Sequence, residues 1–429
     1  MRTPLLFVLA ATSLVVGCTA DDSAPSTSST DATVSSTTVP TGPAPGVTDD
    51  AVKVGLLFVD TSALATAGVD LDLGDVEGAY HALVDDINAD AGINGRMLDP
   101  VYTPVDPSGT VGADRACVEV SEDQQVFVAA GLFLADAVLC LVDTHQTAVI
   151  GGEMTPERLE RAAAPWFTTG PGPDLDQAVL RAMDAAGELE GPVAVIAGTA
   201  EEAEMTDVFL PLLDELGVDV VEHAVIDAPQ DDPAATYAQV RTIAERFEAA
   251  GVESVIPLGG AGQTWPNAMA DQPYRPRLVF PQTIGGVQAF LLDASQTDRS
   301  LLEGSIAGGS YAPDQAVYDE AGMRDCIQVI EDAGVDVPGP DEVDDDATPW
   351  IAAFQACPTM ALVRAVLEAA GDDLNYGTLQ AAGEGLGELL IPGDPAPRHY
   401  GPPPATDGDP TPYLFTWDAS AEEYVQLED

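Results

Sequence analysis

Basic residues are scarce in this sequence. Its 429 residues include 15 Lys plus Arg against 72 Asp plus Glu, which gives a formal net charge of −57, and Lys53 is the only lysine. A nucleic acid would meet a repulsive field with few cations available for phosphate contacts. The composition therefore argues against a nucleic-acid partner and against an acidic lipid surface, and we expect most carboxylates to form a solvated surface.

Motifs for metal binding and catalysis are also lacking. No CxxC pair occurs, and the histidines lie far apart, at His81, His145, His223 and His399. A GxSxG elbow, an HExxH helix and a Walker loop are absent. Asp70, Asp72 and Asp75 suggest calcium, but the remaining EF-hand ligands are missing, so an acidic loop is favoured. We predict no metal site, no cofactor and no catalytic residue.

The N-terminus has the layout of a secretory signal. Arg2 precedes an apolar run from Leu5 to Val16, which is too short for a comfortable membrane span. The run closes on Gly17-Cys18, which resembles the lipobox of bacterial lipoproteins and implies that Cys18 is diacylated. Residues 19–50 are rich in Ser, Thr and Pro and cannot bury enough apolar surface to order, so we predict a disordered tether.

Beyond residue 50, short apolar runs alternate with amphipathic stretches. This alternation predicts an α/β fold with parallel sheets, and the 46% of hydrophobic residues can build a sizeable core. The predicted strands are Val52 to Val59, Gln125 to Gly131, Thr147 to Gly151, Pro192 to Ala197, Ser254 to Leu258 and Arg277 to Phe280.

Helical stripes separate these strands. Val76, Ala79, Tyr80, Leu83 and Ile87 share one helix face, and similar spacing follows in 209–216 and 240–247. The segment Trp166 to Pro173 is rich in Gly and Pro and indicates a crossover between two Rossmann-like lobes. The C-terminal part predicts helices at 315–333 and 349–370 and a closing hairpin at 413–424.

Once Cys18 is assigned to lipid, Cys117, Cys140, Cys326 and Cys357 remain. An exported chain with four cysteines favours two disulfides, for which three pairings are possible. We favour Cys117 with Cys140 and Cys326 with Cys357, because each pair joins neighbouring predicted helices.

A family resemblance appears in two segments of the first lobe. Val52-Lys53-Val54-Gly55-Leu56-Leu57, and the helix end Asp86-Ile87-Asn88 followed by Gly92-Ile93-Asn94-Gly95-Arg96, resemble the opening of type I periplasmic binding proteins, in particular the branched-chain amino acid family of ABC importers. Val193 to Ile196, Val255 to Gly260 and Phe415 to Asp418 resemble later parts of that family. The glycines and Asn94 suit a sharp reversal between helix and strand.

The resemblance implies two α/β lobes with parallel sheets, joined by three crossovers near Thr169, Thr283 and Arg398. The expected domains are a signal peptide (1–18), a tether (19–50), a first lobe (51–169 and 284–398) and a second lobe (170–283 and 399–429). The implied function is a membrane-anchored extracytoplasmic receptor that captures a small molecule and delivers it to an ABC permease. A sensor or an envelope interaction module on the same fold is the alternative.

In open parallel sheets, ligands bind beyond the carboxyl ends of the strands. This rule selects loops in both lobes. The candidate ligand-binding residues are Asp60, Thr61, Ser62, Phe133, Leu134, Asp136, Glu153 and Thr155 in the first lobe, and Glu201, Gln263, Trp265 and Gln282 in the second.

The loop after the third strand departs from the family pattern. Residues 131–136 read Gly-Leu-Phe-Leu-Ala-Asp, where the family has a Ser- or Thr-rich loop. We therefore expect Phe133, Leu134 and Trp265 to form an apolar or aromatic floor, with surface exposure or lobe packing as the alternative for each. Asp136, Glu153 or Glu201 would then recognise a cationic or hydroxylated group, and Trp265 is the strongest single candidate.

Overall fold

The computed structural model describes residues 44–66, 72–107, 110–133, 136–152, 154–170, 175–228, 233–283, 299–309, 314–343, 347–394, 397–401, 412–420 and 423–427. The predicted signal peptide, the lipidation site Cys18 and most of the predicted tether lie outside these residues.

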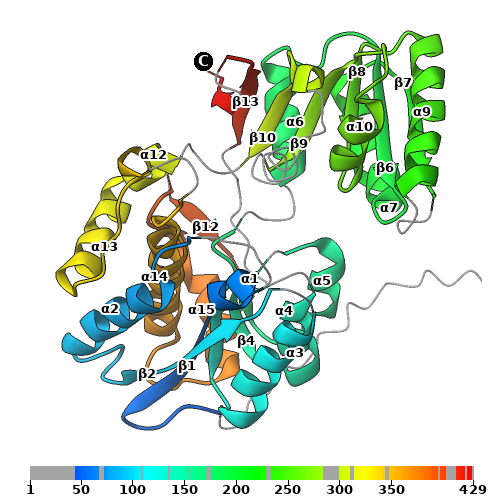
Figure 1. Ribbon diagram of the computed structural model, residues 1–429. Coiled ribbons are helices and arrows are strands. Elements are labelled where there is room, and N and C mark those ends of the chain that lie inside the picture. The colour runs from blue at the N-terminus through cyan, green and yellow to red at the C-terminus, as the bar shows by residue number, and fades with distance from the viewer. Residues whose placement is uncertain are drawn as a thin grey trace, which may run out of the picture. The chain divides into compact units, whose positions relative to one another are not determined.

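The first sheet is parallel throughout and has the strand order β2-β1-β3-β4-β5 (Figure 1). Its central strands are runs of Val, Ile, Leu and Ala that are buried on both faces, as expected for a parallel sheet covered by helices. The strands are β1 (Ala51–Val59), β2 (Met97–Val105), β3 (Val128–Gly131), β4 (Ala148–Gly151) and β5 (Trp166–Phe167).

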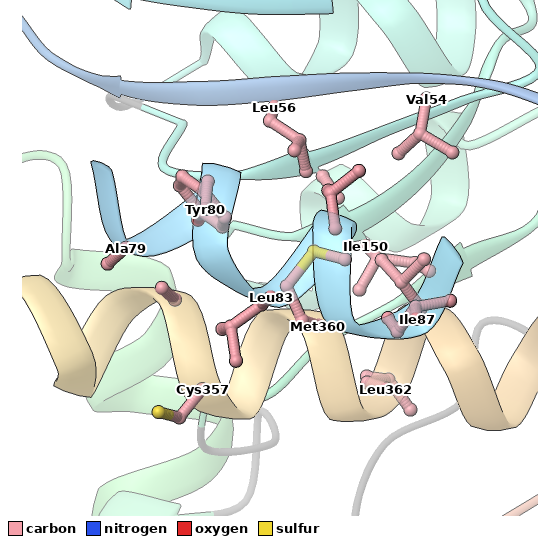
Figure 2. Close-up of a cluster of buried hydrophobic side chains, with 14 of the residues drawn as sticks. Val54, Leu56, Ala79, Tyr80, Leu83, Ile87, Ile150, Cys357, Met360 and Leu362 are labelled. Carbon is pink, nitrogen blue, oxygen red and sulfur yellow. The ribbon is translucent and has the colours of Figure 1, made fainter. Parts of the chain in front are cut away.

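One face of this sheet carries most of the C-terminal helices. Figure 2 shows Tyr80, Leu83 and Ile87 of α2 between β1 and the long helix α14, where they meet Leu56 and Met360. This apolar cluster is the largest part of the core. The helices that contribute to it are α2 (Val76–Ala89), α12 (Asp314–Tyr318), α13 (Ala321–Asp332), α14 (Ile351–Ala370) and α15 (Tyr376–Leu386).

The opposite face is covered by shorter helices whose apolar side chains form a separate cluster around Val120, Leu141 and Trp166. These helices are α3 (Thr110–Val118), a π-helical turn (Glu119–Asp123), α4 (Ala137–Leu139) and a second π-helical turn (Cys140–His145). At the carboxyl end of the sheet lie α1 (Thr61–Thr66) and α5 (Pro156–Arg161).

The second sheet has the order β14-β13-β10-β9-β8-β6-β7. It is parallel from β7 to β10 and ends in the antiparallel hairpin β13–β14, which confirms the predicted closing hairpin. Its strands are β6 (Val193–Gly198), β7 (Val220–Ile226), β8 (Ser254–Pro257), β9 (Arg277–Thr283), β10 (Ile306–Gly309), β13 (Tyr413–Asp418) and β14 (Glu423–Gln426).

Helices cover both faces of this sheet as well, and each face has its own apolar cluster. On one face lie α9 (Pro233–Ala250) and α10 (Ala261–Met269). The other carries α6 (Leu175–Ala185), a π-helical turn (Met205–Phe209) and α8 (Leu210–Leu216), and the short helix α7 (Glu202–Glu204) directly precedes that turn. The α/β fold with two parallel-sheet bodies is therefore as the sequence predicts.

The chain passes between the two sheets three times: after β5, after β10 and after β12. The second passage was misplaced at Thr283, because β10 pairs in parallel with β9 and so keeps 299–309 in the second body. The third lies after Tyr400, whose ring is buried in the core of the first body. A small antiparallel pair, β11 (Gly387–Leu389) and β12 (Arg398–Tyr400), precedes it.

The end of the predicted tether is also corrected. Residues 44–50 belong to the folded body, because Ala44 and Val47 pack against its core and the Lys53 amide donates to the Gly46 carbonyl at 2.8 Å. Arg96 holds the same segment through a hydrogen bond from Nε to the Thr48 carbonyl at 2.9 Å. The body therefore begins at or before Ala44.

Both predicted disulfides are confirmed. Cys117 and Cys140 join two helical segments on one face of the first sheet, and Cys326 and Cys357 join α13 to α14 on the other. The single helix predicted over 315–333 is wrong, because it is split into α12 and α13. Glu320 lies at the break, where its carboxylate accepts from the amides of Gly322 and Met323 and so starts a new helix.

Helix α14 is long and apolar enough to cross a membrane by length and composition alone. Its side chains nevertheless pack into the core of the first body, between α2, α13 and α15, and include the disulfide-bonded Cys357. We therefore interpret α14 as the central helix of a folded core.

Candidate functional site

The carboxyl ends of β1, β3 and β4 meet at one edge of the first sheet, which we call the first-sheet edge. Leu57 pairs with Gly131, and Gly131 pairs with Gly151, so β3 and β4 end in register with each other, two residues before the end of β1. Loops that leave from this edge contain the first-lobe residues predicted to bind ligand, as far as the structure describes them. This is the position at which open parallel sheets bind ligands.

Glycine is required at the ends of β3 and β4. Gly131 and Gly151 have φ values of +113° and +123°, which only glycine adopts readily. A Cβ atom on Gly131 would lie 2.3 Å from the Leu57 carbonyl oxygen, and one on Gly151 would lie 2.2 Å from the Gly131 oxygen. The two strands therefore end in bare backbone, with no side chain at either position.

Asp60 organises the turn between β1 and α1. Its Oδ1 accepts hydrogen bonds from the Ser62 hydroxyl at 2.6 Å, the Ser62 amide at 3.1 Å and the Ala63 amide at 3.2 Å. The bond from the Ser62 side chain is the main reason why the pKa of Asp60 is lowered. Asp60, Thr61 and Ser62 thus lie together at the first-sheet edge, with Asp60 ionised.

Phe133 is buried and lies against Gly151 and Gly152. The cavity beside it has a volume of about 10 Å³ and apolar walls, which include Leu57 and Cys117. Such a space holds about one water molecule and no solute. Phe133 is therefore part of the core that packs against the first-sheet edge. Leu134 and Glu153 lie outside the described residues.

Asp136 and Thr155 are both joined to a residue that the sequence analysis missed. Arg158 donates from Nε to Oδ1 of Asp136 at 2.9 Å, and its amide donates to the Thr155 hydroxyl at 3.3 Å. Thr155 thereby caps α5, which has Pro156 in its first turn. The Thr-Pro pair was a usable helix-start signal, and it would have placed Arg158 beside the predicted loop.

The second sheet presents a similar edge, at the carboxyl ends of β6 and β8. Glu201 follows β6, and its carboxylate lies over Gly259, which follows β8. A Cβ atom on Gly259 would come within 2.4 Å of Glu201 Oε1. Because Gly259 has a φ of +52°, the close approach depends on glycine. The side chain of Glu201, which follows β6, therefore lies beside the end of β8.

The prediction for Trp265 is wrong. Its side chain is 0% exposed and stacks on Phe247, with ring centroids 5.8 Å apart and an interplanar angle of 22°. Ala261, Trp265, Ala268 and Met269 share the core-facing side of α10, a spacing of i, i+4, i+7 and i+8 that was readable in the sequence. The side chains of Gln263 and Gln282 lie outside what the structure describes.

One potential metal-ligand group occurs among the described residues, formed by Cys117, Cys140 and His145, whose ligand atoms lie within 4.8 Å of one another. Both cysteines are consumed by their disulfide, so neither offers the thiolate that binds zinc. In the acidic loop, Asp72 accepts from the Gly74 amide and Asp75 caps α2 through the Gly78 amide. Both carboxylates therefore accept hydrogen bonds from the backbone.

No protein-family model and no curated protein matches the sequence. Solved structures do match over most of the chain. A solute-binding protein of an ABC transporter from R. palustris, in complex with 4-hydroxybenzoate, has 16% identity and a TM-score of 0.57, and covers 89% of this chain and 96% of its own.

Two further matches have the same extent. An ABC transporter substrate-binding protein from Desulfitobacterium hafniense, in complex with Leu, has 12% identity and a TM-score of 0.60, with 88% and 100% of the two chains covered. A periplasmic binding protein type 1 from Bordetella pertussis Tohama I has 14% identity and a TM-score of 0.59, with 89% and 100% covered. The chain therefore has the fold of type I periplasmic binding proteins.

Proposed function

We propose that the protein is a lipid-anchored extracytoplasmic solute-binding protein, which captures a small molecule and delivers it to an ABC permease. The observation that carries this proposal is the fold: two parallel-sheet bodies, three chain passages between them, and a match to solute-binding proteins over 88–89% of the chain. Fold alone does not determine function, so the sites must support it.

The first-sheet edge supports the proposal. Its strands end in glycine backbone at Gly131 and Gly151, and polar groups of Asp60, Ser62 and Thr155 lie in the adjoining loops. Backbone N–H groups and a few placed polar side chains are the usual means of orienting a small ligand. Ligand binding by these groups would need no catalytic residue.

The sequence supports an extracytoplasmic, membrane-anchored location. The apolar run that ends at Cys18 suits export and lipidation, and the two disulfides suit an oxidising compartment. Cys18→Ala tests the anchor directly. We expect this variant to leave the membrane fraction of its native host, whereas unchanged membrane attachment would contradict lipidation at Cys18.

A thermal-shift screen of the purified protein tests solute binding. The panel contains amino acids, aromatic acids, fatty acids, amides, polyamines and small sugars. A solute present at 100 times its Kd stabilises the folded state by about 2.7 kcal/mol, which raises the melting temperature measurably. A folded protein that responds to no compound would contradict the proposal, and co-purification of a permease with the tagged protein would test delivery.

A further inference from the structure

Arg158 and Asp136 form an asymmetric ion pair. The side chain of Arg158 is 13% exposed, whereas that of Asp136 is 76% exposed. Water and salt weaken the attraction between an exposed carboxylate and its cation, so another anion can readily replace such a carboxylate. The guanidinium is thus held in a nearly buried position beside a carboxylate that solvent reaches freely.

The pair lies beside the carboxyl ends of two strands of the first sheet, the position at which open parallel sheets bind ligands. Asp136 lies in the loop that follows β3 and Arg158 in the helix that follows β4, and these strands are neighbours whose ends are the glycines Gly131 and Gly151. No side chain extends from either glycine, so the guanidinium lies beside backbone groups, together with Asp136 and the Thr155 hydroxyl. In a chain with 15 Lys plus Arg and 72 Asp plus Glu, a cation here is exceptional.

A guanidinium is suited to one class of ligand. Its planar set of N–H donors matches a carboxylate, and such charge-assisted bonds are stronger than neutral ones. We propose that Arg158 recognises the carboxylate of an organic-acid solute, and that Asp136 holds the guanidinium until the solute carboxylate joins or replaces it. This inference rests on the proposed function and names its ligand class.

The chain offers a matched control on the same helix. Arg161 also lies in α5 and also forms an ion pair, from Nη2 to Oδ2 of Asp143 at 3.0 Å. Its side chain is 49% exposed and that of Asp143 is 37% exposed, so this pair is an ordinary surface one. Removing either arginine changes the net charge equally, and only Arg158 faces the loop after β3.

The experiment compares acids with their amides. Dissociation constants are measured by calorimetry for 4-hydroxybenzoate against 4-hydroxybenzamide, octanoate against octanamide, and leucine against leucinamide. For the pair whose acid binds, we expect the acid to bind at least about tenfold more tightly than the amide. In Arg158→Gln this ratio should fall to near one, while in Arg161→Gln it should stay at the wild-type value.

Arg158→Lys keeps the charge without the planar donors, and we expect a ratio between those of the wild type and Arg158→Gln. It also serves as the test if Arg158→Gln does not fold. If the preference for the acid over its amide in Arg158→Gln or Arg158→Lys equals that of the wild type, the inference is overturned and the proposed function stands. Wild-type protein that binds only non-acidic compounds would overturn the inference as well, and binding of none would contradict both.

Discussion

The hydroxyl group of Tyr400 donates a hydrogen bond to the backbone oxygen of Thr168 at 3.0 Å, and both residues are buried. Thr168 in turn donates from Oγ1 to the Gly152 carbonyl at 2.9 Å, directly beyond β4. Arg398 donates to the Gly170 carbonyl at 2.9 Å. The chain segments that leave the first body after β5 and after β12 are therefore fastened to each other and to the first-sheet edge.

The first prediction concerns the hydrogen bond from Tyr400 to Thr168. Tyr400→Phe keeps the ring in the core but removes the donor, which leaves the buried Thr168 carbonyl short of a hydrogen bond. We expect a loss of about 1–3 kcal/mol in the free energy of unfolding, measured by urea titration. Tyr102→Phe is the control, because Tyr102 is only half-buried and its ring packs at a tilt against the exposed His81, with ring centroids 3.8 Å apart. Equal losses in the two variants would contradict a specific role for the Tyr400 hydroxyl.

The second prediction separates packing from binding at Trp265. Trp265→Ala leaves a large cavity beside Phe247 and should cost about 3–5 kcal/mol, measured by guanidinium denaturation with circular dichroism. Trp265→Phe keeps a ring in the stack and removes an indole N–H that has no hydrogen-bond partner among the described residues, so it should cost less than half as much. A stable Trp265→Ala protein that no longer binds its solute would restore Trp265 as a ligand residue.

Much of the fold was predictable because buried parallel strands are short apolar runs and α2 carries one clear apolar stripe. The strand β2 was missed for the converse reason. It lies at the edge of the first sheet and contains Pro100 and Pro104, which an edge strand tolerates and a central strand does not. The alternating, half-exposed strand β7 was missed because it lacks a continuous apolar run.

The candidate site was less predictable, because the choice of loops follows from topology whereas the direction of a side chain does not. The loops around Asp60, Asp136 and Thr155 do adjoin one edge of the first sheet, as expected. An aromatic residue soon after a strand end suggests a ligand contact, but the phase of α10 directs Trp265 to the core. Arg158 is absent from the predicted residues because the strand-end rule selects loops, whereas Arg158 lies on the helix α5 that follows such a loop.

The third prediction concerns the disulfides. Replacing Cys326 and Cys357 with Ala should lower the free energy of unfolding by about 3–4 kcal/mol in the chain-entropy description, since their sequence separation is 31 residues. The matched variant lacks Cys117 and Cys140, which are separated by 23 residues, and should lose a similar amount. Because the two bridges lie in different core clusters, the losses should add in the quadruple variant. A loss below about 1 kcal/mol for either pair would contradict this account.

The last prediction is a pH dependence at Glu320. Burial raises the pKa of this carboxyl group, but hydrogen bonds from the amides of Gly322, Gly393 and Met323 outweigh it, so the pKa lies below its usual value of 4.5. A pKa lowered by folding means that the ionised group stabilises the protein above the unfolded-state value and that this stabilisation is lost as the pH falls through the folded-state value. Glu320→Gln should therefore lower the melting temperature at pH 7, where the lost cap costs about 1 kcal/mol.

The difference between the wild type and Glu320→Gln should narrow steadily below about pH 4.5 and nearly vanish once the wild-type carboxyl group is protonated. Glu368→Gln is the control, since Glu368 pairs with Arg364 on the exposed side of α14 and such a pair contributes only about 0.3–0.5 kcal/mol. Melting curves of all three proteins between pH 7 and pH 3 check the prediction. A gap for Glu320→Gln that stays constant over this range would contradict the prediction, because it would not depend on the ionisation of Glu320.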